Sequence, residues 1–430
     1  MKLGLFAPAR EESVGMVWND LSMAPPLNLA IVAALTPPDV DITLIDENVT
    51  AIDFGRRFDL VGITVVTHTA LRAYEIADAF RARGAKVVLG GIHPTMLPEE
   101  ASQHADAIVV GEAEGVWASL VEDFREGKLK RVYHSNSRPS LADLPLPRRD
   151  LFAKEKYFAG NTISTTRGCP FSCSFCSVTS FFGKTYRSRP IEDVLKEIRV
   201  LDDGKPIFFV DDNIGANPRY AKEFFRSLVP YRIKWMSQTS ITMAKDKELL
   251  RLAAASGCFA LYIGFESLSP ANLASVGKKC NIVTEYEQAV KEIQSHGIAI
   301  AGSFILGLDG DDEDVFERTV HFAQKVGLEY AQFGILSPFP GTAVYKALDR
   351  EERIITRDWS QYRLDNVVFE PKLMSRETLK RGHDWAWREF YSLPSILRRI
   401  GIVHHYLFPL WAINLSCRRH WRRQARIAHY

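Results

Sequence analysis

The stretch Cys169-Pro-Phe-Ser-Cys173-Ser-Phe-Cys176 decides how the rest of the chain is interpreted, because it places three of the six cysteines close together. It directly follows a predicted strand, Asn161–Arg167. Cysteine thiolates are the preferred ligands of iron–sulfur clusters, which normally take four of them. No fourth cysteine is near in the sequence. Three ligands on a tight loop therefore predict a [4Fe–4S] cluster with one iron open to an external molecule.

A zinc site of three cysteines and one histidine is the alternative for the same loop. Structural zinc sites usually pair two C-x2-C halves, and this favours the cluster. The next cysteines, Cys258 and Cys280, are distant in the sequence and isolated. Together with Cys417 they are interpreted as ordinary free thiols.

The spacing C-x3-C-x-aromatic-C, formed by Cys169, Cys173, Phe175 and Cys176, resembles the signature of the radical S-adenosylmethionine (SAM) enzymes. The resemblance implies that the open iron binds the amino and carboxylate groups of SAM. It also implies that one electron cleaves SAM to methionine and a 5′-deoxyadenosyl radical, which abstracts hydrogen from a substrate. An electron donor such as a flavodoxin or a ferredoxin is implied with it.

Length and composition bound the class of protein. The 430 residues suffice for about two or three domains, and a hydrophobic fraction of 46% can fill their cores. Few cysteines, three of them clustered, argue against a disulfide scaffold and favour a reducing compartment. The apolar run after Lys2 ends at Arg10 and is too short for a secretory signal. The sequence therefore predicts a cytoplasmic protein.

Residues 1–135 alternate predicted strands and helices, which predicts a parallel, doubly wound, Rossmann-like α/β sheet. The strand candidates are short runs rich in Val and Ile, as expected for strands covered on both faces. They are Lys2–Ala7, Asp41–Ile45, Leu60–Val66, Lys86–Leu89 and Ala107–Val110. Helical patterns between them are Pro26–Leu35, Ala70–Arg83 and Val116–Phe124.

Three loops after those strands are candidate ligand contacts, because such sheets bind ligands beyond the carboxyl ends of their strands. Glycine there allows a ligand to approach the backbone. This layout resembles the cobalamin-binding domain of one radical SAM subgroup and implies a cobalamin cofactor. The candidate cofactor-binding residues are Thr67, His68, Gly90, Gly91, His93, Gly111 and Glu112.

The Asp-x-His-x-x-Gly motif that supplies a cobalt ligand in many cobalamin enzymes is absent after the first predicted strand. His68 and His93 are therefore expected in the pocket wall or in loop hydrogen bonds, not on cobalt. The alternative for the whole domain is a flavodoxin-like fold without a cofactor, in which the glycines serve turns.

Residues 136–160, rich in Ser, Pro and Arg, are predicted to be a linker. From 161 to 345 six strand–helix units follow, too few to close an eight-stranded barrel, and they predict an open, partial (β/α)6 barrel with its chemistry at the carboxyl ends of the strands. The strands are Asn161–Arg167, Ile207–Val210, Lys234–Gln238, Ala260–Gly264, Ala299–Ile305 and Ala331–Leu336. The helices are Ile191–Leu201, Arg219–Leu228, Lys247–Ala255, Val283–His296 and Asp312–Lys325.

Polar residues and glycines at these strand ends are candidate SAM contacts. In the family that the cysteine loop resembles, an acidic motif after the second strand holds the amino group, an acid after the fourth can hold the ribose hydroxyls, and a glycine-bearing strand contacts the adenine. The matching residues are Asp211, Asp212, Gln238, Ser240, Glu266, Gly302 and Gly307. The structural alternatives are an aspartate that caps the next helix and a Glu266 buried as an ion-pair partner.

Residues 346–430 are aromatic, basic and predicted to be mainly helical. From residue 390 onward there are seven arginines and no acidic residue. The apolar run 400–415 is shorter than the about 20 residues that span a bilayer. With Arg418, Arg419, Arg422, Arg423 and Arg426 beyond it, it predicts peripheral contact with an anionic membrane. The alternative is a helical cap over the barrel mouth with solvated arginines, and specific nucleic-acid binding is not expected.

The leading hypothesis is a cobalamin-dependent radical SAM enzyme. In the family, these two cofactors together usually mean methylation of an unreactive carbon, here of a small-molecule or lipid-like substrate. A second hypothesis keeps both cofactors but ends in cyclisation, coupling or rearrangement. A third, of another class, is a non-catalytic sensor that binds an iron–sulfur cluster and a corrinoid.

Overall fold

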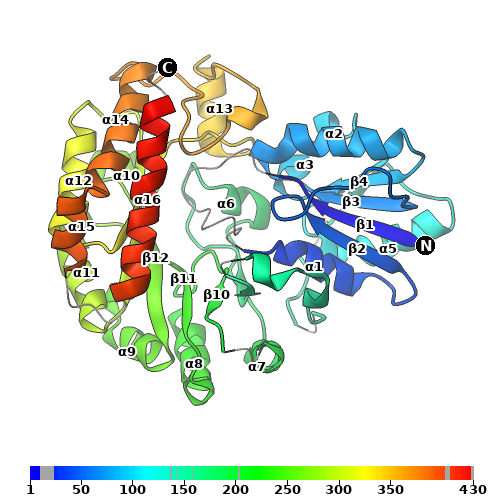
Figure 1. Ribbon diagram of the computed structural model, residues 1–430, viewed down its shortest axis with the longest axis horizontal. Helices are drawn as coiled ribbons and strands as arrows, with labels where there is room; N and C mark the ends of the chain where they lie inside the picture. Colours follow the sequence, from blue (N-terminus) through cyan, green and yellow to red (C-terminus); the bar gives the residue numbers. More distant parts are fainter. Residues whose placement is uncertain are drawn as a thin grey trace.

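The computed structural model describes residues 1–9, 24–135, 138–142, 144–157, 159–201, 204–401 and 407–427, without the side chains of 407–409 and 422–427. Two parallel six-stranded sheets lie next to each other, one near each end of the molecule (Figure 1). The first is formed by the N-terminal third of the chain and the second by the middle of the chain. The predicted fold class, a Rossmann-like sheet followed by a partial barrel and a helical C-terminal segment, is confirmed.

The N-terminal sheet has the strand order β2-β1-β3-β4-β5-β6. The first five strands follow the flavodoxin-like order of doubly wound folds. The sixth was not predicted, because residues 132–134 form too short a run to stand out from the adjacent loop. The strands are β1 Lys2–Ala7, β2 Asp41–Asp46, β3 Leu60–Thr64, β4 Lys86–Gly90, β5 Ala107–Val110 and β6 Val132–His134.

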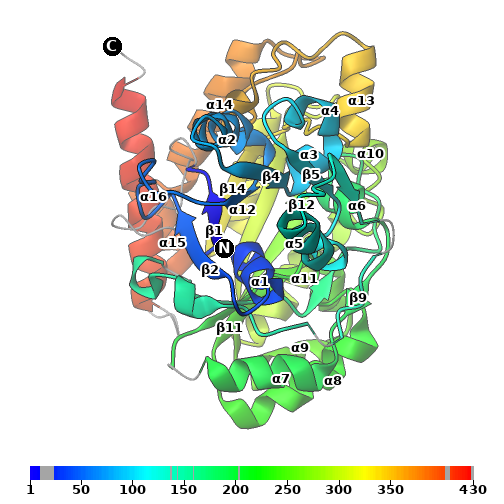
Figure 2. The same ribbon diagram turned by 90° about the vertical axis from the view of Figure 1, so that its right-hand side faces the viewer.

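Helices cover both faces of this sheet (Figure 2). Helix α2 (Ala70–Arg81) packs on one face. Helices α1 (Leu27–Leu35) and α5 (Trp117–Arg125) pack on the other. In α5 the buried residues Trp117, Leu120 and Val121 recur with helical spacing, so they form one apolar stripe against the sheet. Two short helices, α3 (Ile92–Met96) and α4 (Pro98–Ala101), follow β4.

The second sheet has the order β14-β13-β12-β11-β10-β7 and all its pairs are parallel. Strands β7 and β14 are its two edges, so the barrel is open as predicted. The strands are β7 Asn161–Ile163, β10 Ile207–Phe209, β11 Trp235–Thr239, β12 Cys258–Glu266, β13 Ala299–Leu306 and β14 Tyr330–Ile335. The helices between them are α7 Ile191–Val200, α8 Pro218–Leu228, α9 Lys247–Ala255, α10 Pro270–Ser275, α11 Tyr286–Ser295 and α12 Val315–Lys325.

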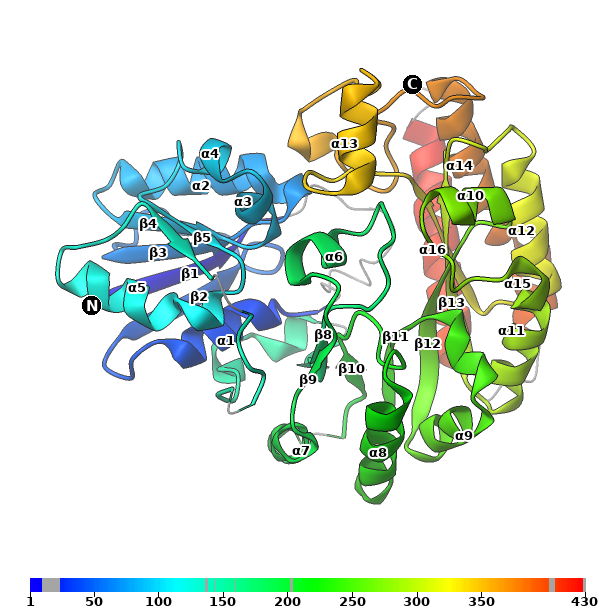
Figure 3. The same ribbon diagram turned by 180° about the vertical axis from the view of Figure 1, so that it is seen from behind.

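The strand predicted over Asn161–Arg167 is split in two. After β7 the chain leaves the sheet, and β8 (Thr166–Arg167) pairs antiparallel with β9 (Arg187–Ser188). The cysteine loop and helix α6 (Ser177–Phe182) lie between these two short strands. Figure 3 shows α6 between the N-terminal sheet and the barrel.

The C-terminal helices α14 (Arg376–Phe390), α15 (Leu393–Ile400) and α16 (Leu407–Ile427) pack alongside the β14 edge of the barrel, and a cap over its mouth stays a prediction. The indole of Trp387 donates to Phe333 O at 2.8 Å and stacks on Trp421 with ring centroids 5.0 Å apart. Arg399 is buried and donates to Leu328 O at 2.7 Å, so one tail arginine is structural.

Membrane contact through the tail stays a prediction. Arg419 is exposed and Arg418 half-buried, whereas the side chains of Arg422, Arg423 and Arg426 lie outside the description. In the part of the chain that is described, no helix is both long enough and apolar enough to cross a bilayer.

A strap between α13 (Ala343–Arg350) and α14 returns to the N-terminal domain. Its residues Trp359, Tyr362 and Val368 belong to the same buried core as the α2 face of the N-terminal sheet. The Trp359 indole donates to Glu100 Oε1 at 2.8 Å. The core of the first domain is therefore completed by residues from the last third of the chain.

Candidate functional site

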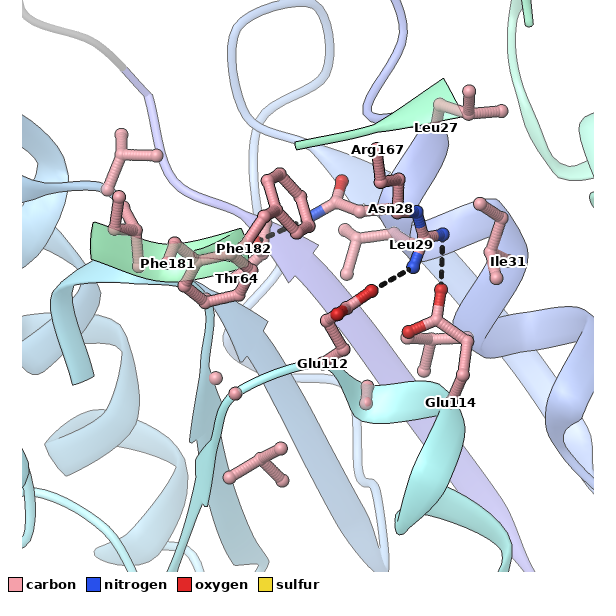
Figure 4. A pocket seen from close by; sticks show the side chains of 18 of the residues that line it. Leu27, Asn28, Leu29, Ile31, Thr64, Glu112, Glu114, Arg167, Phe181 and Phe182 are labelled. Carbon is pink, nitrogen blue, oxygen red and sulfur yellow. Dashed lines mark hydrogen bonds and ion pairs between the residues drawn. The ribbon is translucent and has the colours of Figure 1, made fainter. Parts of the chain in front are cut away.

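A cavity of about 390 Å³ lies where the carboxyl edge of the N-terminal sheet faces the start of the barrel. Its walls come from three parts of the chain (Figure 4). The loops of the N-terminal sheet, helix α1 and the segment around the cysteine loop each contribute side chains. Central among them are Leu27, Asn28, Ile31, Thr64, Gly90, Gly91, Gly111, Glu112, Glu114, Arg167, Phe181, Phe182 and Asp212.

Glycines shape the N-terminal part of this cavity. Gly91 has φ +103°, and a Cβ there would lie 2.8 Å from Val65 O, so glycine is needed for the loop to adopt this path. At Gly62, in β3, a Cβ would lie 2.9 Å from Leu5 Cδ2 and 3.3 Å from the Trp117 ring. Since Leu5, Gly62 and Trp117 also line the cavity, it extends as a narrow apolar slot between the sheet and its helices. The side chains of Leu5 and Trp117 pack closely over Gly62 and thus form the walls of this slot.

The two histidines that were expected in the pocket wall or in loop hydrogen bonds do not line this cavity. His93 is fully buried, and its Nε2 lies 3.1 Å from the Tyr74 hydroxyl and 3.2 Å from Glu100 Oε1. His68 is half-buried and Thr67 is buried, and neither is among the described residues that line the cavity. Because α3 begins directly after Gly91, the side chain of His93 is placed in the core on the α2 face. The glycines of the predicted set line the cavity, whereas His93 is held by hydrogen bonds in the core of the domain.

Glu112 lines the cavity as predicted, but it is ion-paired. Its carboxylate contacts Arg167 at 2.8 Å and Arg187 at 2.6 Å, and Arg167 also contacts Glu114. Arg167 and Arg187 are neighbours across the β8–β9 ribbon, whereas both glutamates follow β5. We name these four residues the ion-pair cluster. Sequence reasoning missed both arginines, because neither stands in a recognisable motif.

The cysteine loop is held by hydrogen bonds within the loop and to the barrel. Ser174 N donates to Val276 O at 2.9 Å, and Cys176 N donates to Cys173 O at 3.1 Å. The amide of Asn213 lies 3.8 Å from the Cys169 sulfur as a donor. Burial raises the pKa of Cys173 to about 12, so this thiol must lose its proton when iron binds.

The chemistry of these donors fits an iron–sulfur cluster. All six cysteines are free, and thiolates with N–H donors beside them are the usual environment of such clusters. Among the described residues, no three or more His, Cys, Asp or Glu side chains are arranged to hold a single metal ion. A ready-made mononuclear site is therefore not seen in the described part of the chain.

Cys280 is a free thiol, as predicted, on a turn that lies against the cysteine loop although the two segments are far apart in the sequence. Its turn packs on the cysteine loop through the Ser174–Val276 hydrogen bond, and Asn281 N donates to Lys278 O within the turn at 3.2 Å. Burial raises the pKa of the Cys280 thiol, and the positive charge of Lys278 acts in the opposite direction. No sequence pattern indicates this packing, because the two loops follow different strands.

The two aspartates after β10 have different surroundings. Asp211 is fully buried and accepts hydrogen bonds from both Thr165 and Thr166, at 2.8 Å from Thr165 N and 2.8 Å from Thr166 Oγ1. Its oxygens are thus used within the protein, which corrects its predicted role as a SAM contact. Asp212 lines the cavity and accepts from Gly168 N at 3.1 Å. Burial raises the pKa of each carboxyl to about 6.

Glu266 is a buried ion-pair partner, the structural alternative given above. It contacts Lys278 Nζ at 2.9 Å and has φ +65°, an unfavourable value for a residue with a side chain, at a register shift of β12. Strained backbone of this kind is often found at functional sites. Lys278 also acts on Cys173, where its positive charge lowers the thiol pKa against the larger effect of burial. The contact of Glu266 with the SAM ribose stays a prediction.

The remaining predicted SAM contacts mostly serve packing. Ser240 N donates to Asn213 Oδ1 at 3.1 Å, and Gln238 is half-buried in β11. A Cβ at Gly302 would lie 2.6 Å from Leu328 Cδ1, and one at Gly307, with φ +88°, 2.7 Å from Leu379 Cδ2. These two glycines therefore allow close contact with neighbouring side chains.

A polar pair on β12 and β14 was missed. The hydroxyl of Tyr262 donates to Gln332 Oε1 at 2.6 Å. Both residues occupy half-buried positions that alternate with fully buried ones along their strands. The period-two alternation was the available sequence signal.

Two family models match the sequence. One is described as the radical SAM superfamily and covers residues 163–323; the other is described as a B12 binding domain and covers residues 18–121. The chain is 35% identical to a bacteriochlorophyllide d C-12(1)-methyltransferase from Chlorobaculum tepidum, over 96% of this chain and 92% of that protein. It is 26% identical to a hopanoid C-2 methylase from Rhodopseudomonas palustris, over 91% of this chain and 83% of that protein.

A solved structure has the same fold. The radical SAM methyltransferase TsrM from Kitasatospora setae, with cobalamin and a [4Fe–4S] cluster bound, matches with a TM-score of 0.70 at 16% identity. The match covers 99% of both chains.

Proposed function

Because the chain belongs to the radical SAM superfamily and carries a B12-binding domain before its barrel, we propose that it methylates an unactivated carbon of an apolar polycyclic substrate. Its cofactors are a [4Fe–4S] cluster, SAM and cobalamin, as expected from the cysteine loop and the N-terminal layout. Together they supply a 5′-deoxyadenosyl radical and a transferable methyl group. The protein binds, orients and shields them.

We assign the holding residues from the geometry above. Cys169, Cys173 and Cys176 hold the cluster, with Asn213 as a donor to sulfur. The glycine-lined loops after β3, β4 and β5 and the slot at Gly62 hold cobalamin. Asp212, at the cavity wall beside the cysteine loop, is the acidic group available to the amino group of SAM.

The observation that carries the proposal is the shared cavity. One wall belongs to the B12-binding domain, and another is α6, which begins directly after Cys176. A substrate carbon in this space faces both cofactor sites. The walls formed by Leu27, Ile31, Phe181 and Phe182 are apolar, which suits a polycyclic ligand and excludes water. By their names, the two relatives above methylate a chlorophyllide and a hopanoid.

The proposal is tested by product analysis. Reconstituted protein, with cobalamin and SAM labelled by deuterium in its methyl group, is incubated without oxygen with bacteriochlorophyllide d or with a hopanoid. Reduced flavodoxin or ferredoxin supplies the electron in separate arms. The expected product carries one labelled methyl group. The type of substrate is identified by whether this product forms with bacteriochlorophyllide d or with the hopanoid. A product without added carbon would indicate cyclisation, coupling or rearrangement, and absence of 5′-deoxyadenosine in every arm would favour the sensor.

A further inference from the structure

The ion-pair cluster of Glu112, Glu114, Arg167 and Arg187 connects the two walls of the cavity (Figure 4). We propose that it is a positioning device that fixes the cysteine loop relative to the cobalamin-binding loops and so sets the distance over which the methyl group is transferred. This inference rests on the proposed function.

On the N-terminal side, the cluster is tied to the loops that line the cavity. Glu112 directly follows Gly111, whose N–H donates to Thr95 Oγ1 at 3.0 Å. The hydroxyl of Thr95 donates in turn to Gly91 O at 2.7 Å. The loops after β4 and β5 are thus linked to each other, and Glu112 extends that link to Arg167.

On the barrel side, the link to the first cysteine is short. Arg167 precedes Gly168, which has φ +84° and donates its N–H to Asp212 Oδ2 at 3.1 Å. Cys169 follows directly. Arg187 holds the other strand of the ribbon and donates to Pro139 O at 2.8 Å. A shift of the Arg167 guanidinium would therefore move the start of the cysteine loop.

The burial of these charges distinguishes positioning from simple stabilisation. The side chains of Arg167, Glu112, Glu114 and Arg187 are 11%, 5%, 10% and 17% exposed. Taking such charges out of water costs about as much as their attraction returns, so buried ion pairs are weak evidence of added stability. They do require one geometry, because arginine binds carboxylates through a planar fork of fixed donors. An apolar contact of the same size would allow the two walls of the cavity to shift against each other, whereas these ion pairs fix their relative position.

If the ion-pair cluster is disrupted, we expect radical formation to proceed without a matching amount of methyl transfer. Radical formation depends on the barrel alone, whereas methyl transfer also needs the substrate carbon within reach of the N-terminal domain. A misplacement of about 1 Å can reduce such a step ~100-fold. If the ion-pair cluster is loosened, SAM cleavage should therefore continue, but fewer of the radicals should lead to methylation. More 5′-deoxyadenosine should then form per methylated product.

The test uses the double variant Glu114→Gln/Arg167→Gln, which keeps the net charge, removes both ion pairs of Arg167 and leaves Arg187 paired with Glu112. The matched control is Tyr157→Phe, which removes a hydrogen bond from the linker to Asp46 Oδ2, 3.0 Å in length and outside the cavity. The first readout is the magnetic coupling between cob(II)alamin and the reduced cluster, which reports their separation. The second is hydrogen exchange in residues 111–115 and 168–176 without any cofactor. The third is the ratio of 5′-deoxyadenosine to methylated product.

We expect the double variant to give a broader range of couplings, faster exchange in both loops and a ratio raised ~10-fold or more, with the control like the parent. Unchanged coupling and exchange in the double variant would overturn the inference, as would failure to load the cluster or cobalamin. If the double variant does not fold, Arg167→Lys, which keeps the charge but loses the fork, takes its place. If the parent methylates neither substrate, the coupling and exchange readouts still decide the role of the cluster independently of the proposed function.

Discussion

The two parallel sheets share an architecture but present different surfaces at their carboxyl edges. The N-terminal edge offers glycines and apolar side chains, as at Gly62, Gly91 and Ile31. The barrel edge is rich in polar side chains that bind one another: Asp211 with two threonines and Glu266 with Lys278. The first surface can receive the body of a large ligand, whereas the second fixes a short metal-binding loop. A charged residue at a strand end is thus weak evidence of ligand contact, because it can be bound within the protein.

The largest effect should come from a substitution in the cysteine loop, on the barrel side of this comparison. Cys173→Ala removes one of three thiolates, so the cluster should not assemble; iron content should fall from about four per chain toward zero, and SAM cleavage should be lost. Iron analysis and the visible spectrum after anaerobic reconstitution check this. Cys258→Ala is the control, because Cys258 is buried in β12 away from the loop. Full iron loading in Cys173→Ala, or stoichiometric zinc in the parent, would contradict the assignment.

The next largest effect should come from a substitution that alters the N-terminal domain alone. Gly62→Val adds methyl groups where a Cβ already lies 2.9 Å from Leu5 Cδ2, so it should narrow the slot and weaken cobalamin binding ~10-fold or more. Gly334→Ala, in β14 of the barrel and outside the cavity, is the comparison, because its Cβ would make an ordinary contact of 3.5 Å with Leu364 Cβ. Titration with hydroxocobalamin measures both. Equal affinities in the two variants would show that the slot holds no part of the cofactor.

The sequence was sufficient for the elements and for the cysteine loop. Strand and helix periods located β1 and β5 to the residue, and local spacing alone identified Cys169, Cys173 and Cys176. It was insufficient where tertiary contacts assign the role. His93 and Asp211 stand at strand ends like ligand contacts, yet burial and hydrogen bonds direct them into the protein. Arg167 is the opposite case: no sequence motif marks it, yet the pairing of β8 with β9 places it in the cavity.

The smallest effects should distinguish the roles of the neighbouring residues Asp211 and Asp212. Asp211→Ala leaves the N–H groups of Thr165 and Thr166 buried without an acceptor, so stability should fall by about 2–3 kcal/mol. Asp212→Asn keeps an acceptor for Gly168 N and should unfold like the parent, but it should bind SAM ~10-fold more weakly for want of a charge. Thermal unfolding and equilibrium dialysis with SAM separate the two. The assignment of roles fails if the effects are reversed.

The strap that carries Trp359, Tyr362 and Val368 has a consequence for how the protein is made. The N-terminal sheet leaves the ribosome first, but three residues of its core are synthesised only after the whole barrel. At about 5–20 residues per second, the interval between β6 and Val368 is roughly 10–50 s. Throughout that time the nascent domain exposes the apolar surface that the strap will cover. The N-terminal sheet is therefore translated before the barrel, but its core is completed after the barrel.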